Sequence, residues 1–333
     1  MASAGAVSAH GWLRGVAAVA LALAAVAGHA QAVDERRPMR LIVPAPPGGS
    51  ADKVGHLVAA QLAPLVGRPI RVDDIATGGL VGGINAIAAS APDGETLGLA
   101  VSTAMIGGRF LIRGARYNPT EDFVWFAILG SYANAMVIPA RDPARTLEQW
   151  VEAKRSSPRP LVAGSFGPGS AGHLATSYLR VEQRINLVPR FIDTLDDGYA
   201  LLASGAIDVL FDGVPNAVVE LPKSGHRAIA VTSSEPVATF PDLPAFGKVW
   251  PGVSFEVWLG LVAPKGLPEA TRARLATAIN ALLLDRRHAE SLRAAGLRYR
   301  GIGATDALAF VEDEVLRTAR LISRFGETTS PAR

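Results

Sequence analysis

The sequence predicts an α/β protein, and its first two strand–helix units indicate a parallel sheet. Apolar strands alternate with amphipathic helices along the chain, and a glycine-rich loop joins strand to helix near residues 46–50 and again near 165–170. With 333 residues, 49% of them hydrophobic, the chain can bury a core large enough for two domains. We therefore expect two α/β units joined by short crossing segments.

Residues 1–32 are expected to form a secretory signal peptide. Arg14 precedes an apolar run that ends at Ala27, and a small-residue cleavage site follows at Ala30-Gln-Ala32. The run is shorter than the roughly 20 apolar residues that span a bilayer. Cleavage after Ala30 or Ala32 would release the mature protein into an exported compartment.

Charge and cysteine content exclude several classes of protein. Removal of residues 1–32 leaves 32 basic against 30 acidic residues, a balance that indicates neither nucleic acid nor an anionic membrane as a partner. Because cysteine is absent, the chain has no disulfide framework, no thiolate metal site and no lipid-bearing residue at the cleavage site.

The first strand–loop–helix unit covers residues 40–66. A predicted strand leads into a Pro-Pro-Gly-Gly-Ser loop and an amphipathic helix, for which Ser50 and Asp52 are N-cap candidates. Helix N-termini carry free amides and a positive dipole end, so Gly48, Gly49 and Ser50 are candidates for binding a carboxylate or phosphate. An ordinary turn that uses glycine for its geometry is the alternative.

Two further strands follow in the same pattern. The sequence predicts a strand over 69–75, a glycine loop and helix ending near residue 90, and a buried strand over 97–101. Ser102 and Thr103 fall at the carboxyl end of that last strand. Because open α/β sheets bind ligands at this edge, both hydroxyls are candidates for the same site as the first loop.

The middle of the chain repeats the strand–loop–helix organisation. Predicted strands cover 126–129, 135–139, 160–164, 207–211 and 227–232, and predicted helices cover 146–156, with Thr146 as N-cap, and 173–181. His173 opens a helix directly after a glycine and serine loop, where its side chain could either contact a ligand or act as a second cap. Asp212 ends a strand, where a turn residue and a ligand contact are both open.

The C-terminal part is predicted as a strand over 259–264 followed by helices over 269–284 and 305–325. We expect these helices to return to the first unit. The predicted domains are a first lobe of residues 33–134 with 256–333, and a second lobe of residues 135–255.

Motifs for catalysis and metal binding are weak. Ser50-Ala-Asp-Lys53 has the Ser-x-x-Lys spacing of serine acylases, but the companion motifs are missing, and Pro168–Gly172 is one glycine short of a nucleophile elbow. The histidines of the mature chain have no metal-ligand spacing, which argues against a zinc site. The sequence therefore predicts no catalytic residue, no metal site and no cofactor.

The run from Leu41 to Asp52 resembles a motif of the tripartite tricarboxylate transporter substrate-binding proteins, the Bug (TctC-like) family. The resemblance continues along nearly the whole mature chain. Its further matches are Gly78-Gly79, Gly82, Ala91–Gly94, Ser102-Thr103, Tyr117–Pro119, Asp122-Phe123, Gly164-Ser165, Gly167, Gly169-Ser170, His173-Leu174, Val188-Pro189, Gly205–Asp212, Gly225–Arg227, Ala230–Thr232, Pro241–Pro244, Trp258–Leu261 and Ala263-Pro264.

This resemblance implies a type II periplasmic-binding-protein fold, with two α/β lobes and a ligand cleft between them. It also implies a periplasmic, monomeric protein that holds a small organic acid and delivers it to membrane permease subunits. The implied ligand-binding residues are Gly48, Gly49, Ser50 and Ser102 or Thr103 in the first lobe, and Ser165, Ser170, His173 and Asp212 in the second.

The sequence departs from the family pattern in loops of the expected site. Residues 190–194 replace the usual tyrosine, basic residue and glycine, and Gly213 stands where an asparagine is usual. Ile106-Gly-Gly108 replaces a typical Ile-Asn-Pro. We therefore expect a ligand that can differ from the commonest one of the family.

Three hypotheses for function follow. The leading one is a periplasmic solute-binding protein for a small carboxylate, serving a tripartite transporter. A receptor that presents its ligand to a membrane sensor is equally compatible with the sequence. An exported α/β hydrolase using Ser50 or Ser170 is disfavoured, because no base and orienting acid accompany either serine.

Overall fold

The order of helices and strands confirms the predicted α/β class. The computed structural model describes residues 37–328, so the predicted signal peptide lies outside the described residues. The strands are β1 (Met39–Val43), β2 (Ile70–Asp74), β3 (Thr96–Val101), β4 (Phe123–Ile138), β5 (Leu161–Ser165), β6 (Leu187–Phe191), β7 (Val209–Gly213), β8 (Arg227–Val231), β9 (Glu256–Pro264) and β10 (Arg298–Gly303).

Helices of very different length connect these strands. They are α2 (Ser50–Val66), α3 (Val81–Ala88), the π-helix η1 (Thr103–Gly108), α4 (Arg109–Leu111), α5 (Leu147–Arg155), α6 (Ala171–Val181), α7 (Leu195–Ser204), α8 (Val214–Ser224), α9 (Phe246–Val249), α10 (Glu269–Leu284), α11 (Arg286–Ala294) and α12 (Ala304–Phe325). Within the described residues, no helix combines the length and the apolar character needed to cross a membrane.

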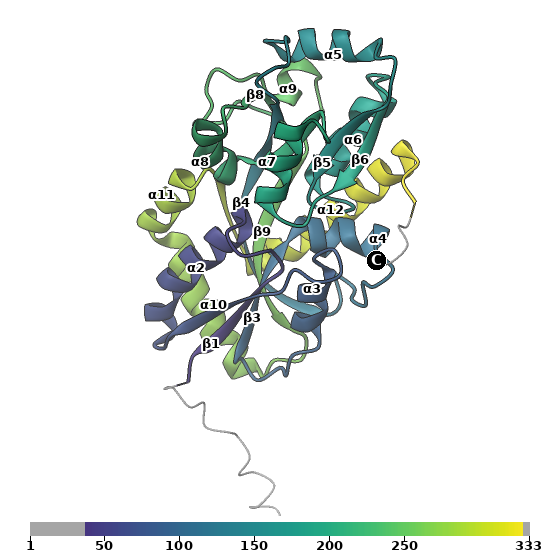
Figure 1. Ribbon diagram of the computed structural model, residues 1–333. Helices are drawn as coiled ribbons and strands as arrows, with labels where there is room; N and C mark the ends of the chain where they lie inside the picture. The colour runs from purple at the N-terminus through teal and green to yellow at the C-terminus, as the bar shows by residue number, and fades with distance from the viewer. Residues whose placement is uncertain (1–36, 329–333) are drawn as a thin grey trace, which may run out of the picture. The chain divides into compact units, whose positions relative to one another are not determined.

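The strands form two groups, and each group belongs to one α/β lobe. In the first, the order is β2-β1-β3-β9-β4, with β1 parallel to both β2 and β3, as the repeated strand–helix pattern predicts. In the second, β5 lies between β6 and β7 and is parallel to both. Figure 1 shows the first group with α2, α3 and α10 below and the second group with α5 to α8 above.

Strand β4 belongs to both lobes. Phe123–Ala133 pairs with β9, whereas Asn134–Ile138 pairs with β7 and β8. The prediction of two separate strands here is therefore wrong. Gly130 lies within the continuous strand, and a Cβ at this position would lie 2.7 Å from the carbonyl oxygen of Arg298, so the glycine permits β10 to pack against β4.

Helix α5 illustrates how sequence pattern and packing agree. The Thr146 side chain accepts a hydrogen bond from the Gln149 amide, which confirms the predicted N-cap. Trp150 is fully buried on the apolar side of the helix. Burial of one large apolar side chain stabilises the fold by roughly 1.5–3 kcal/mol, so this side fixes α5 against its lobe.

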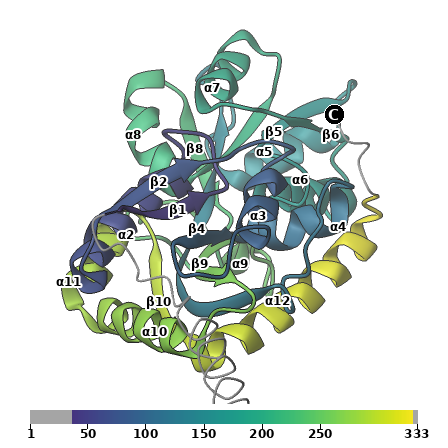
Figure 2. The same cartoon turned by 90° about the horizontal axis from the view of Figure 1, so that it is seen from below.

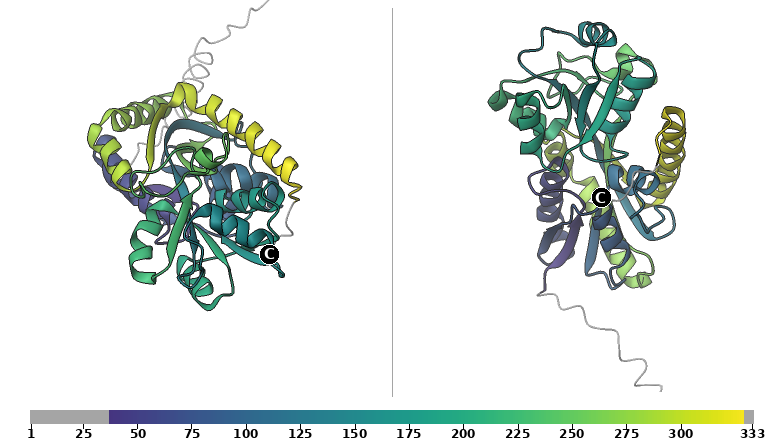
Figure 3. Two further views of the ribbon diagram at one scale, coloured as in Figure 1. Left: turned by 90° about the horizontal axis from the view of Figure 1, so that it is seen from above. Right: turned by 45° about the vertical axis from the view of Figure 1, so that its right-hand side comes forward.

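The C-terminal helices reach both lobes. Helix α10 packs against α2 of the first lobe, as expected, but the end of α12 packs against α6 of the second. In Figures 2 and 3, α12 is the long yellow helix along one side of the unit. Residues from Pro38 onward form one compact unit, and the proposed lobe boundaries stay a prediction.

Candidate ligand-binding site

A pocket lies between the two lobes and receives residues from both. The empty space in it, counted together with the opening to solvent, is about 660 Å³. It is lined by Pro44, Ala45, Pro46, Pro47, Gly49, Ser50, Ala51, Leu80, Val101, Thr103, Tyr132, Asn134, Phe166, Ser170, Leu195, Asp212, Gly213, Asn216 and Val257.

The N-termini of five helices converge on this pocket. Ser50 and Leu195 are the first residues of α2 and α7, while Leu80, Ser170 and Gly213 are the N-caps of α3, α6 and α8. Each helix N-terminus carries about half a positive charge on its unpaired amides. The pocket is therefore built for an anion more than for a neutral or cationic solute.

The loop of the first lobe presents different amides from those predicted. The Gly48 amide donates to Asp52 Oδ2 at 2.7 Å, and the Gly49 amide donates to the Pro46 carbonyl at 3.1 Å. Gly49, with no side-chain cap, is the N-cap, so the prediction of Ser50 or Asp52 at that position is wrong. The amides left for a ligand are those of the first turn, at Ser50, Ala51 and Asp52.

The Ser50 hydroxyl is available to a ligand. Ser50 is buried, and its Oγ has no hydrogen-bond partner among the described residues. A Cβ on Gly213, across the pocket, would lie 2.6 Å from this oxygen, so the start of α8 approaches the start of α2 closely. An unpartnered buried hydroxyl costs free energy unless a ligand or water satisfies it.

The loop of the second lobe is held by hydrogen bonds with residues outside the pocket lining as well as by its own serine. Ser170 accepts a hydrogen bond from the His173 amide and so caps α6, while His173 Nδ1 accepts from the Gly169 amide at 3.0 Å. The other ring nitrogen, Nε2, lies 3.3 Å from Glu327. Because Nδ1 is an acceptor, the ring proton is on Nε2, facing the carboxylate.

Glu327 connects the C-terminal segment to this loop. It also accepts hydrogen bonds from Ser177 and Arg180 of α6. Burial alone would raise the pKa of Glu327, but hydrogen bonds from His173 and Ser177 hold it at about 2. The segment directly after α12 therefore anchors α6 and, through His173, the second loop.

Asp212 supplies a buried carboxyl group with an altered pKa. Burial raises the pKa of Asp212 to about 7, against hydrogen bonds from Tyr199 and Asn216 that lower it. Lys53 donates to Asn216 Oδ1 at 2.9 Å, and its positive charge also lowers the pKa of Asp212. Burial and the nearby Asp212 charge raise the pKa of Tyr132, which keeps its hydroxyl a hydrogen-bond donor.

Some of the nine predicted site residues line the pocket and others do not. Gly49, Ser50, Thr103, Ser170 and Asp212 line it. Gly48 and His173 instead support the two loops. The hydroxyl of Ser102 accepts from the Trp258 amide, and Ser165 is fully buried outside the lining.

Sequence reasoning did not identify the other polar residues of the lining. Tyr132 and Asn134 lie in the part of β4 that the sequence suggested was a connection, and Asn216 lies in α8, a helix that the sequence did not predict. Polar residues two apart on a strand share a face, which is the signal that a continuous β4 would have given.

The loops of the two lobes touch at a pair of glycines. A Cβ on Gly107 would lie 2.2 Å from the Gly169 carbonyl oxygen, and a Cβ on Gly169 would lie 2.4 Å from the Gly107 carbonyl carbon. Gly107 belongs to the Ile-Gly-Gly departure from the family pattern. The absence of a side chain there allows η1 and the second loop to close against each other.

An apolar groove adjoins the pocket. It shares Pro46, Leu80 and Phe166 with the pocket and adds Ile112 and Phe191 to its wall.

No histidine lines the pocket among the residues that the structure describes. Ser50 and Ser170 therefore have no histidine base beside them in the pocket.

The two lobes and their interlobe pocket define a solute-binding protein. The chain belongs to the family whose model is described as tripartite tricarboxylate transporter family receptor, which matches residues 54–326. It is similar to protein BugT of Bordetella pertussis, with 30% identity over 87% of this chain and 90% of that protein. The resemblance seen in the sequence is thereby confirmed.

Solved structures confirm the fold. Rpa4515 of R. palustris, solved with adipate, has a TM-score of 0.83 at 23% identity, and the match covers 90% of this chain and all of that one. MatC of Rhodopseudomonas palustris, solved with bound malate, has a TM-score of 0.76 at 24% identity, over 86% of this chain and 99% of that one.

Proposed function

We propose that the chain is a periplasmic receptor that captures a small carboxylate-bearing solute for a tripartite tricarboxylate-type transporter. The convergence of five helix N-termini on one interlobe pocket carries this proposal. Free amides and positive dipole ends stabilise a carboxylate without requiring a fully buried cationic side chain. The first-turn amides of α2 and the Ser50 hydroxyl receive one carboxylate.

The rest of the lining suits a small organic acid. Tyr132, Asn134 and Asn216 offer hydrogen-bonding groups, and Lys53 adds a positive charge through Asn216. Asp212, when protonated, can donate a hydrogen bond to a second oxygen of the ligand. Adipate and malate, the ligands in the two similar structures, are dicarboxylates and guide the choice of ligands to test.

A serine hydrolase receives no support from the geometry. Ser170 uses its hydroxyl to cap α6, and the nearest histidine in sequence, His173, faces Gly169 and Glu327. A nucleophilic serine needs a base within hydrogen-bond reach. Membership of the transporter receptor family supports delivery to permease subunits over presentation to a sensor.

Export completes the proposal. We infer that residues 1–32 direct secretion and are removed near Ala30 or Ala32, and that the mature chain is a monomer. Intact mass spectrometry of protein recovered from the periplasm tests the cleavage site. Sedimentation at micromolar concentration tests the monomer.

Binding is tested with carboxylates and neutral counterparts of the same shape. Adipate or malate at a hundredfold excess over Kd should stabilise the mature protein by about 2.7 kcal/mol, whereas adipamide should leave its Tm unchanged. A carboxylate library without any shift, beside a large shift from a neutral sugar, would refute the proposal. Ester hydrolysis that is lost in Ser50→Ala would favour the hydrolase instead.

A further inference from the structure

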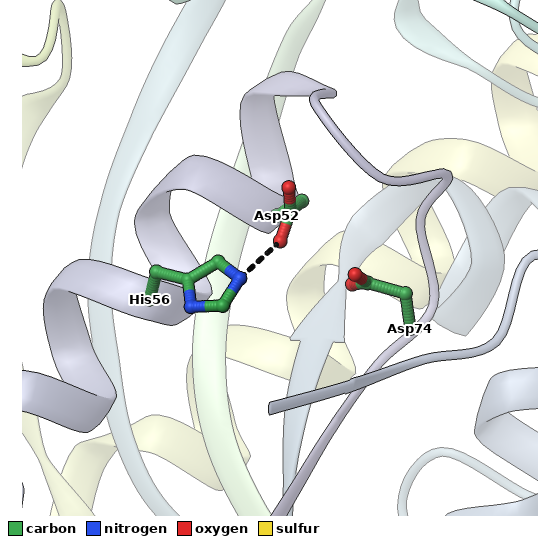
Figure 4. Close-up of side chains that lie close together, drawn as sticks. All are labelled: Asp52, His56 and Asp74. Carbon is green, nitrogen blue, oxygen red and sulfur yellow. Dashed lines mark ion pairs between the residues drawn. The ribbon is translucent and has the colours of Figure 1, made fainter. Parts of the chain in front are cut away.

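A second cluster of potential ligand atoms lies beside the first loop, outside the pocket. Asp52 and His56 are one turn apart on α2, and Asp74 is the last residue of β2. Figure 4 shows the imidazole of His56 and the carboxyl group of Asp74 directed toward Asp52. None of the three residues is a lining residue of the pocket.

The cluster has the dimensions of a metal site. One nitrogen of His56 and one oxygen from each carboxylate all lie within 4.8 Å of one another, and Asp52 Oδ1 is 3.1 Å from His56 Nε2. Ligand atoms about 2.0–2.2 Å from a tetrahedral ion lie roughly 3.3–3.6 Å apart. Small side-chain rotations therefore suffice to bring all three atoms to bonding distance.

Two buried oxygens of this cluster accept no hydrogen bond from the described part of the chain. Asp52 is 7% exposed, and neither its Oδ1 nor Asp74 Oδ1 has a hydrogen-bond partner in the described part of the chain. The guanidinium groups of Arg40 and Arg71 pair with the neighbouring Asp73. Two such oxygens facing each other need a positive group or a shared proton between them, and the His56 imidazole beside Asp52 Oδ1 carries a positive charge only when it is protonated.

We propose that Asp52, His56 and Asp74 bind a divalent transition-metal ion of the Zn²⁺ type. One imidazole and two carboxylates supply three ligands, and water completes a tetrahedral shell. The imidazole favours this class over Mg²⁺ and Ca²⁺, which prefer six or more oxygen ligands. His56 is exposed on α2, so the site is open to solvent on that side and an ion can enter.

The ion would also fix the ligand loop. The second oxygen of Asp52 accepts the hydrogen bond from the Gly48 amide, so the same carboxylate would join the metal to the loop at the pocket. Metal binding to Oδ1 would hold this side chain, and with it the turn at Gly48, in one orientation. The metal site itself does not depend on the identity of the solute.

Titration of the untagged mature protein with ZnCl₂ tests the site. After removal of metal with EDTA, the wild type should bind one Zn²⁺ with an increase in Tm, and should bind Mg²⁺ and Ca²⁺ far more weakly. His56→Gln and Asp74→Asn should each weaken Zn²⁺ binding at least tenfold. Because His56 is exposed, the metal-free Tm of His56→Gln should match that of the wild type.

His226→Gln is the matched control, since it removes a histidine outside the cluster and should keep wild-type affinity for Zn²⁺. Absence of Zn²⁺ binding by the wild type would overturn the proposal and leave a shared proton between the two carboxyl groups. Equal affinity in His56→Gln and wild type would also overturn it. None of these results depends on carboxylate binding, so the metal site and the proposed function can fail separately.

Discussion

The two loops at the pocket, residues 46–50 and 166–170, look alike in sequence but work differently. Each places glycine before a serine at the start of a helix. In the first loop, Asp52 accepts a hydrogen bond from the Gly48 amide, and the Ser50 hydroxyl has no hydrogen-bond partner among the described residues. In the second, Ser170 uses its hydroxyl as the helix cap, and His173 secures the Gly169 amide.

This difference indicates that the two loops have different roles. In the first loop, the Asp52 carboxylate accepts the hydrogen bond from the Gly48 amide, so the Ser50 hydroxyl and the first-turn amides of α2 are left for the ligand. The second has used its serine on its own helix and is braced by Glu327 from the C-terminus. We infer that the first loop supplies affinity and the second supplies a rigid wall that meets η1.

The largest effect is expected where the second loop meets η1. In Gly107→Ala, the new Cβ would lie 2.2 Å from the Gly169 carbonyl oxygen. Because this oxygen belongs to the main chain, no side-chain rotation can relieve the clash. The lobes should be held apart, with carboxylate affinity falling at least about a hundredfold, which is about 2.7 kcal/mol. Calorimetric titration measures the loss.

Gly114→Ala is the control for this change, because its Cβ would meet only Val81 Cγ2 at 3.9 Å. That variant should bind as the wild type does. Wild-type affinity in Gly107→Ala would show that closure of the two loops is not needed for binding.

The next effect distinguishes the first serine. Ser50→Ala removes a hydroxyl that lines the pocket and has no hydrogen-bond partner in the described part of the chain. It should weaken carboxylate binding roughly ten- to a hundredfold, as expected for loss of a hydrogen bond to a charged group. The free energy of unfolding without ligand should not fall. A loss of stability with unchanged Kd would assign Ser50 to the fold alone.

Asp212 should make binding depend on pH. Its pKa of about 7 means that the carboxyl group is mostly protonated at pH 6 and mostly ionised at pH 8. The ionised form repels a carboxylate ligand, so affinity should be about tenfold weaker at pH 8 than at pH 6. Asp212→Asn should bind with nearly equal affinity at both values, and a pH dependence that persists in this variant would exclude Asp212 as its source.

The fold was predictable from the sequence wherever a local pattern agreed with packing. The unit from β1 to α2, the Thr146 cap and helix α10 follow from apolar spacing and cap residues. The continuity of β4 could not be predicted from local pattern, because Gly130 within it packs against β10, which is far away in sequence. The same tertiary origin explains why Tyr132 and Asn134 were missed in the candidate site.

The candidate site was predictable as a set of loops but not residue by residue. Sequence alone indicates that His173 follows a glycine loop, whereas its contact with Glu327 depends on how the end of α12 packs. The Asp52, His56 and Asp74 cluster shows the same point, since the pairing of β1 with β2 places Asp74 beside α2.

Glu327→Gln should act on stability more than on binding. Because the folded pKa of about 2 lies below the ordinary value of 4.5, the ionised carboxylate stabilises the fold above pH 4.5, and this contribution is lost as pH falls toward 2. The variant should be less stable at pH 7 by about 1–2 kcal/mol after allowance for partial exposure. Urea unfolding at pH 7 and pH 4 checks that the difference shrinks with acid.

The smallest effect is expected for the second serine. Ser170→Ala removes a helix cap, which typically costs about 1 kcal/mol of stability, and should change carboxylate affinity less than Ser50→Ala does. If the loops differ in this way, urea unfolding should show the larger loss of stability in Ser170→Ala, and calorimetry the larger loss of affinity in Ser50→Ala. Equal losses of affinity would mean that both hydroxyls contact the ligand.

A crystal structure with a bound dicarboxylate tests the central claim most directly. We predict one carboxylate in the interlobe pocket, with an oxygen about 2.7–3.2 Å from the main-chain nitrogen of Ala51 or Asp52 and within reach of the Ser50 hydroxyl. A carboxylate held only by the 166–170 loop, or one bound outside the pocket, would contradict the assignment of binding to the first loop.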